Sequence, residues 1–307
     1  MNKNGILAIT IVAVVLMASL AGAVMLLQGT PAEDDGDYKL TIVDDRDKII
    51  SFMDSPQRIV SLGSSFTEII IALDETDRLV GVDYSGAALE NIPKNVINLG
   101  KTSTLPMETL LSLEPDVVII WNYNMYQTLI GDMEDKGLKV VAYYPKSVEQ
   151  ILTVMGRIGD ILDVDASPLV DSIRDRINAV AEKTATLSDK ERPRVYLELA
   201  SMSGQTAGGG TLSNELIEMA GGKNIFAYKT GNWGANIEVV KELDPEIIVV
   251  EDSSSRGDGY FTETYPHTSA IKEGHIYRIP AGTLTASPRI VDALENLAHW
   301  LQPELFP

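Results

Sequence analysis

Six side chains in this sequence have the chemistry of a small-molecule site: Tyr84, Trp121, Tyr123, Trp233, Arg256 and Arg289. Four are aromatic rings, which stack on flat or bulky ligands, and two are guanidinium groups, which pair with anions. Each lies in, or close to, a segment that we expect to be a loop beyond a strand. Ligands of open parallel sheets bind beyond the carboxyl ends of the strands, so we expect these side chains to line one cleft.

The sequence has few residues that could bind a metal ion and none that could carry out thiol chemistry. The chain contains no cysteine, which excludes disulfides, thiolate metal ligands, cysteine nucleophiles and lipid attachment through cysteine. Its three histidines, His267, His275 and His299, all lie toward the C-terminus, and His299 falls inside the last expected helix. A Mn²⁺ or Zn²⁺ site needs several imidazole and carboxylate groups around the ion. Binding of a bare transition-metal ion is therefore kept only as an alternative.

No motif indicates catalysis. Ser64 and Ser65 follow an expected strand and open a helix, but the Gly-x-Ser-x-Gly turn of serine hydrolases does not surround them. The run Gly208-Gly209-Gly210 lacks the lysine and the Ser/Thr of a phosphate-binding P-loop. We expect a binding protein with no catalytic residue, no resident cofactor and no metal of its own. A cell-surface protein without a transport role is a further alternative.

The charge balance and the N-terminal segment indicate where the protein works. The chain has 25 basic and 44 acidic residues, and a net charge of −19 disfavours nucleic acid as a partner. Residues 6–27 carry no charge and are long enough to span a bilayer. Lys3 before them and the acidic residues after them predict a cytoplasmic N-terminus with the remainder outside. We expect an uncleaved anchor over residues 1–28; cleavage near Ala21-Gly22-Ala23, giving a secreted protein, is the alternative.

Short apolar segments alternate with helical patterns in two stretches of the chain, residues 55–146 and 191–307. The expected strands are 58–62, 79–82, 116–120 and 138–141 in the first stretch, and 194–199, 247–250 and 275–279 in the second. Ser65 and Glu68 indicate a capping box, and Ser287-Pro288 the start of the last helix. This alternation predicts an α/β fold of two lobes with parallel sheets.

The segment between the two stretches, residues 147–190, has no strand pattern. Apolar residues recur at helical spacing after a capping pair, Ser147 and Gln150, and again after Ser167-Pro168. A helix of about twenty residues is about 30 Å long, which is enough to bridge two small domains. Residues 29–54, ahead of the first stretch, are expected to be an acidic linker and lead-in.

A thirteen-residue pattern occurs twice. It begins at Glu108 and again at Glu238, 130 residues further on, and in each copy a short helix precedes an acidic residue, a proline and four apolar strand residues. Proline disfavours helical geometry in the residue before it, so each helix must end there. The repetition predicts that the two lobes share one design. Each glutamate is either a first-turn residue stabilised by the helix dipole or a contact for a two-fold symmetric partner.

The sequence from about Ser55 onward resembles the substrate-binding proteins of ABC importers for cobalamin, ferric siderophores and haem. The resemblance depends on short motifs in a fixed order: Pro56-x-Arg58-Ile-Val-Ser-Leu, Thr67-Glu68-Ile, Arg78-Leu-Val-Gly81-Val, the segment Glu108 to Trp121, Gly221-Gly222-Lys-Asn224-Ile-Phe226, the repeat at Glu238, and Ala286-Ser287-Pro288-Arg289-Ile. Individually these motifs are weak, and their order and spacing make them specific.

The resemblance implies a fold like that of the class III periplasmic binding proteins, in which one long rigid helix joins two lobes. It implies that Tyr84, Trp121 and Arg289 line the cleft; Trp233 matches only with a one-residue shift. It also implies that Glu108 and Glu238 dock on arginines of a dimeric permease, which works with ATPase subunits. The resemblance leaves ferric siderophores, corrinoids and haem open as ligands, and we favour a siderophore or a corrinoid.

Overall fold

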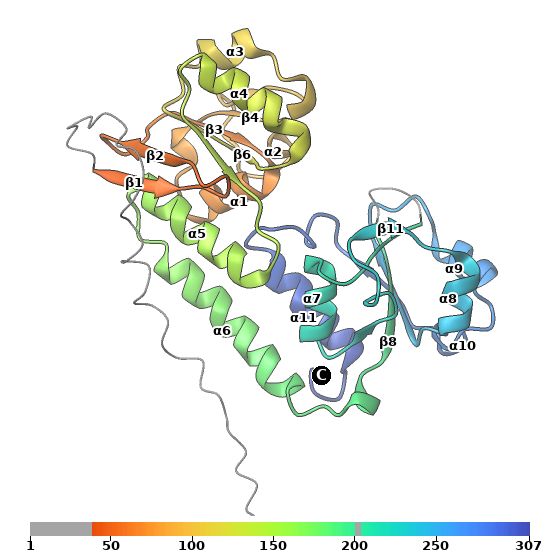
Figure 1. Ribbon diagram of the computed structural model, residues 1–307. Helices are drawn as coiled ribbons and strands as arrows, with labels where there is room; N and C mark the ends of the chain where they lie inside the picture. The colour runs from red at the N-terminus through yellow and green to blue at the C-terminus, as the bar shows by residue number, and fades with distance from the viewer. Residues whose placement is uncertain (1–38, 200–203) are drawn as a thin grey trace, which may run out of the picture. The chain divides into compact units, whose positions relative to one another are not determined.

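The computed structural model describes residues 39–199 and 204–307 of the chain (Figure 1). Residues 38–307 form one compact unit. The expected membrane anchor, residues 6–27, lies outside the described residues. Within the described part, no helix combines the length and the apolar character needed to cross a bilayer.

The first sheet has five parallel strands in the order β5-β4-β3-β6-β7. Its central strands are buried on both faces, as apolar strands of parallel sheets are. The four strands expected here are confirmed, with β6 and β7 shifted by one or two residues. The elements are β3 (Ile59–Leu62), α1 (Ser64–Ala72), β4 (Leu79–Val82), α2 (Tyr84–Ala87), β5 (Ile97–Asn98), α3 (Met107–Ser112), β6 (Val117–Trp121), α4 (Gln127–Asp135) and β7 (Val140–Tyr143).

The second sheet has four parallel strands in the order β10-β8-β12-β13, and a small antiparallel pair, β9 and β11, lies outside it. Three of its strands are those expected from the sequence. The elements are β8 (Arg194–Glu198), β9 (Gln205–Ala207), α7 (Leu212–Met219), β10 (Lys223–Asn224), β11 (Asn232–Gly234), α8 (Ile237–Leu243), β12 (Ile247–Glu251), α9 (Asp258–Thr264), α10 (Ser269–Glu273), β13 (Ile276–Ile279) and α11 (Ile290–Leu301).

The segment between the sheets contains two helices, α5 (Val148–Leu162) and α6 (Ser167–Thr184), so the prediction of one long helix is wrong. The break occurs at Asp163, whose backbone adopts a left-handed conformation (φ 57°). Ser147 caps α5 as expected, accepting a hydrogen bond from the Gln150 amide. Helix α5 contacts β1 and α1, whereas α6 contacts α7 and α11 (Figure 1). Each helix is therefore packed on a different sheet region.

Two predicted helix starts are wrong. Helix α1 begins at Ser64 without a side-chain cap, and Glu68 bonds elsewhere. Helix α11 begins at Ile290, three residues after Ser287. Glu68 bonds instead to the distant Arg289, and the Ser287 hydroxyl accepts a local hydrogen bond from the Arg289 amide (3.3 Å) ahead of the helix.

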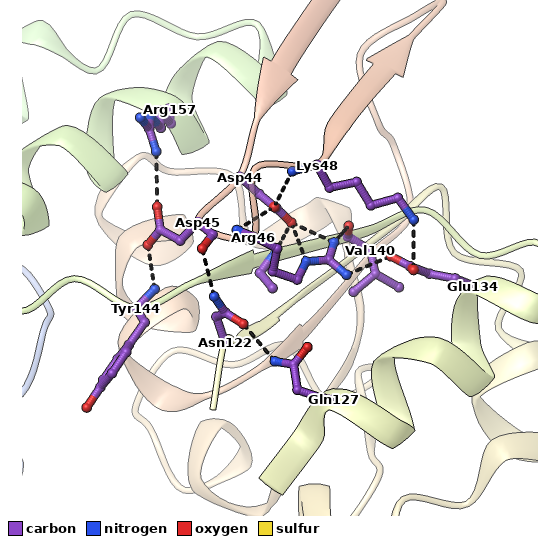
Figure 2. A network of polar contacts seen from close by, with 11 residues as sticks. Asp44, Asp45, Arg46, Lys48, Asn122, Gln127, Glu134, Val140, Tyr144 and Arg157 are labelled. Atoms are coloured by element: carbon purple, nitrogen blue, oxygen red, sulfur yellow. Dashed lines mark hydrogen bonds and ion pairs between the residues drawn. The ribbon is translucent and has the colours of Figure 1, made fainter. Parts of the chain in front are cut away.

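A β-hairpin that the sequence did not indicate precedes the first sheet. Its strands are β1 (Leu40–Val43) and β2 (Ile49–Phe52). The buried Asp44 carboxylate accepts hydrogen bonds from the amides of Arg46, Lys48 and Ala142 and pairs with the Arg46 guanidinium (Figure 2). These bonds fix the hairpin turn against β7.

The internal repeat is visible in the structure. Each copy is a short helix followed by a central strand, α3 before β6 and α8 before β12. The residue before each proline, Glu114 or Asp244, has a positive φ (43° and 45°). An arginine at the start of the neighbouring strand, just before β3 or first in β8, donates to backbone carbonyls at each helix end: Arg58 to Leu113 and Glu114, and Arg194 to Asp244. The two sheet regions therefore share details beyond the thirteen repeated positions.

Candidate ligand-binding site

A hollow of about 590 Å³, large enough to hold a small molecule, opens between loops of the two sheet regions. We call it the cleft. From the first region it is lined by the last residue of β6 and by residues that follow β6 and β7, at the carboxyl ends of these parallel strands. From the second region it is lined by the start of α7, by part of β11 and by the loop before α11. The lining residues are Trp121, Tyr123, Tyr144–Lys146, Gly210–Ser213, Gly231, Asn232 and Leu284–Ala286.

One wall of the cleft is aromatic. The rings of Trp121 and Tyr123 are stacked, with centroids 5.2 Å apart and planes 3° from parallel. Tyr144 meets Tyr123 edge-on at 5.1 Å, and Phe66 supports Trp121 from behind at 4.7 Å. Such contacts hold the rings in fixed orientations and leave their free faces for a ligand.

Trp121 also depends on a glycine. Gly63, at the end of β3, has φ 144°, and a Cβ atom there would collide with the Trp121 indole nitrogen. Only glycine combines this backbone conformation with so close an approach of a side chain. The strand-to-helix turn at Gly63 therefore sets the position of the Trp121 ring.

The Tyr123 hydroxyl remains protonated at neutral pH. Burial, together with the neighbouring phenols of Tyr144 and Tyr126, raises its pKa to about 12. Tyr123 can therefore donate a hydrogen bond to a ligand oxygen.

The opposite wall is polar and largely uncharged. Thr211 caps α7 by accepting a hydrogen bond from the Asn214 amide, and Ser213, Asn232 and Thr285 also line this side. Among the described residues that line the cleft, Lys146 is the only charged one. Aromatic surface with a few hydrogen-bonding groups is the usual lining of a small-molecule pocket.

The structure brings together only two of the six predicted ligand residues, Trp121 and Tyr123. Tyr84 begins α2 and is 65% exposed, away from the cleft lining. Trp233 packs edge-on against Phe226, with the Lys229 ammonium 3.3 Å from its ring centroid. Neither residue lines the cleft in this structure.

The two predicted arginines already have carboxylate partners. Arg256 donates to the buried Glu198 carboxylate (2.9 Å). Arg289 makes two hydrogen bonds to the Glu68 carboxylate (3.0 and 2.5 Å), which raises the pKa of Arg289 although partial burial opposes the shift. Arg289 and Glu68 line a separate hollow of about 460 Å³.

The sequence did not single out Tyr144 and Lys146, although the signal for them was present. Both follow β7, as Tyr123 follows β6 and Trp121 ends it. The rule that located Trp121, that ligands bind beyond the ends of parallel strands, applies equally to them.

Residues 59–283 match the family model described as periplasmic binding protein. The chain belongs to the periplasmic binding protein family. It is therefore an extracytoplasmic binding protein rather than an enzyme, as the sequence indicated.

Two relatives span nearly all of this periplasmic binding protein. An ABC transporter substrate-binding lipoprotein of Bacillus subtilis is 26% identical over 99% of this chain and 99% of its own length. A cobalamin-binding protein of Halobacterium salinarum is 27% identical over 97% of this chain and 85% of its own length. The present chain has no cysteine, so it cannot be lipidated through one.

Solved structures share the fold. A Helicobacter pylori protein with bound Ni(II) is 19% identical, with a TM-score of 0.75 over 87% of this chain and 90% of that one. A periplasmic haem-binding protein of Pseudomonas aeruginosa is 26% identical, with a TM-score of 0.69 over 81% of this chain and 93% of that one. The α/β architecture with parallel sheets is thus the periplasmic-binding-protein fold.

Proposed function

We propose that this protein is the solute-binding component of an ABC importer and that it carries a metal chelate, a ferric siderophore or a cobalamin-type corrinoid, in the cleft. The observation that carries the proposal is the stacked pair Trp121 and Tyr123 on one wall of a 590 Å³ hollow. A hollow of this size lies within the range of small-molecule sites, and stacked rings suit a flat or bulky ligand. The name of the Halobacterium relative supports a corrinoid among the candidates.

The alternative ligand is a bare transition-metal ion. Such an ion needs several imidazole or carboxylate groups at one place. The described lining of the cleft contains no histidine and no carboxylate, and no group of three or more potential metal ligands lies together elsewhere in the described residues. A chelate, which brings its own ligand atoms to the metal, fits this lining better.

The proposal includes the division of the chain. Residues 55–146 and 191–307 act as two lobes, and residues 147–190 connect them. This division is supported by the packing of α5 on the first region and of α6 on the second. Residues 1–28 tether the protein to the membrane and residues 29–54 lead into the first lobe.

Glu108 and Glu238 are proposed as the contacts for the permease dimer. Both side chains are exposed in the first turn of equivalent short helices, α3 and α8. Glu238 has a weak local partner, Lys241, at 2.9 Å. Exposed ion pairs contribute about 0 to 1 kcal/mol each, so these glutamates orient the permease rather than hold it.

Uptake of a radiolabelled chelate by whole cells tests the importer role. The double variant Glu108→Ala with Glu238→Ala should abolish uptake and leave the affinity for the chelate unchanged. Glu182→Ala with Glu263→Ala, which removes two other exposed carboxylates, is the matched control and should transport normally. Normal uptake by the first double variant would refute the docking role, and a lost affinity would place these glutamates in ligand binding. If the wild type transports none of the chelates, the importer role is wrong.

A further inference from the structure

Lys146 is a positively charged residue in the cleft of a strongly acidic protein. The chain carries a net charge of −19, yet the cleft is lined by one described cation and by no described carboxylate. Three arginines line other hollows in the described residues, and each is paired: Arg289 with Glu68, Arg174 with Glu149, and Arg157 with Asp45. No described carboxylate lies within ion-pair distance of the Lys146 ammonium, whose one recorded contact is the Tyr144 ring, 4.9 Å away.

The main chain of Lys146 is fixed although its side chain is exposed. Its amide donates to the Gln150 side chain (2.7 Å), one turn into α5. The Tyr144 amide just before it donates to the Asp45 carboxylate (2.6 Å), which the hairpin turn holds in place (Figure 2). The lysine is therefore presented from a short segment that is anchored on both sides.

Lys146 also lines a second hollow of about 320 Å³, together with Tyr144, Asn122 and Arg157. It thus stands where this side hollow meets the cleft. In the side hollow, one Arg157 nitrogen lies 3.3 Å from Asp45, whose other oxygen accepts from the Tyr144 amide. Tyr144 and Lys146 line both hollows, so a substituent that extends from the cleft toward the side hollow passes these two side chains.

Electrostatics then indicates what kind of substituent belongs there. A strongly acidic protein repels anions at long range, so an anionic ligand needs a local cation. A neutral ligand that fills the cleft would strip water from the Lys146 ammonium without replacing it, which costs free energy. A carboxylate on the ligand would pair with the ammonium and avoid that cost.

We propose that Lys146 selects ligands that carry an anionic group, such as a free carboxylate, next to a bulky chelate. The inference deepens the proposed function and rests on it, because it names the charge of the chelate that the cleft accepts. In this proposal Lys146 determines which ligand charge the cleft accepts, whereas Trp121 and Tyr123 provide the stacking surface.

The test compares pairs of compounds that share a chelate and differ in charge. The pairs are ferrioxamine B, whose free end is an ammonium, and its N-succinyl derivative, whose free end is a carboxylate; cobalamin and its monocarboxylic acid; and haem dimethyl ester and haem. Dissociation constants are measured for the wild type, for Lys146→Gln, and for Lys136→Gln as a control. Lys136 is an exposed lysine at the end of α4, outside the cleft lining, and its substitution changes the net charge equally.

For the pair that binds, the wild type and Lys136→Gln should prefer the carboxylate form by about tenfold, and Lys146→Gln should lose most of that preference. Added salt should weaken the preference in the wild type, since part of the site is open to solvent. Equal affinity for both members, or a preference that Lys146→Gln retains, would overturn the inference and leave the proposed function intact. Failure of all six compounds to bind would overturn the inference, and failure of ferric catecholates as well would overturn the proposed function.

Discussion

At the scale of single residues, the most informative contact is the pair Glu68 and Arg289. It joins α1 of the first region to the start of α11 in the second, across 221 positions of sequence. The Glu68 side chain is 10% exposed and that of Arg289 is 41% exposed. The sequence suggested a helix cap for Glu68 and a ligand contact for Arg289. The cap was inferred from local neighbours and the ligand contact from the family resemblance, and a partner so distant in the sequence leaves no local pattern.

We expect Glu68→Gln and Arg289→Gln each to lower the free energy of unfolding of residues 38–307 by about 1 kcal/mol, because each breaks a charge-assisted hydrogen bond that is only partly screened by solvent. Urea unfolding measures the change. The double variant should be no less stable than the worse single variant, since both substitutions remove the same interaction. If Arg289→Gln instead weakens chelate binding without affecting stability, Arg289 is a ligand residue after all.

At the scale of elements, the hairpin β1–β2 is held by a charged turn. Arg46 bonds to both Asp44 and Glu134, and Lys48 pairs with Glu134 at 2.7 Å (Figure 2). Burial tends to raise the pKa of Glu134, but the hydrogen bonds from Lys48 and Arg46 outweigh it and leave that pKa below its usual 4.5. The folded state therefore favours the charged carboxylate.

This shift predicts a pH dependence. A carboxyl group with a lowered pKa in the folded state stabilises the protein above its unfolded pKa, and that contribution is lost as the pH falls through the folded pKa. Glu134→Gln should lower the free energy of unfolding at pH 7 by about 1 kcal/mol, and its difference from the wild type should shrink below about pH 4. Chemical unfolding across this range measures both effects. Glu149→Gln, in a more exposed pair with Arg174, is the control and should change little. A difference that stays constant with pH would contradict the assignment.

The elements also show what sequence patterns can and cannot predict. Strands β3, β4, β6, β8 and β12 are short apolar runs buried on both faces, and all five were predicted. The hairpin was not, because β1 and β2 are half exposed and their turn contains charged residues where glycine or asparagine would be a recognisable signal. Its stability comes from contacts with β7 and Glu134, which are about a hundred residues away.

At the scale of the whole molecule, a repeated design explains why one cleft lies between two similar sheet regions. The sequence predicted the repeat from thirteen positions, and the structure extends it to Arg58 and Arg194, which hold equivalent helix ends. A hydrogen bond from the Val148 amide to Glu215 of α7 (3.0 Å) further connects the regions beside the cleft. The aromatic wall was predicted in part, through Trp121 and Tyr123. The pairing of Arg256 with Glu198 and of Arg289 with Glu68 could not be predicted, because the partners lie 58 and 221 positions apart in the sequence.

The most direct test of the proposed function is a tryptophan-fluorescence titration of residues 38–307 with cobalamin, ferric hydroxamates, ferric catecholates and haem. Of the three tryptophans, Trp121 stacks on Tyr123 in the cleft, whereas Trp233 and Trp300 lie outside its lining, where Trp300 stacks on Tyr277. We predict saturable quenching by at least one chelate, a much weaker affinity in Trp121→Leu, and an unchanged affinity in Trp300→Phe. No response to any of these compounds, or an affinity that Trp121→Leu leaves unchanged, would contradict the binding of a chelate in this cleft.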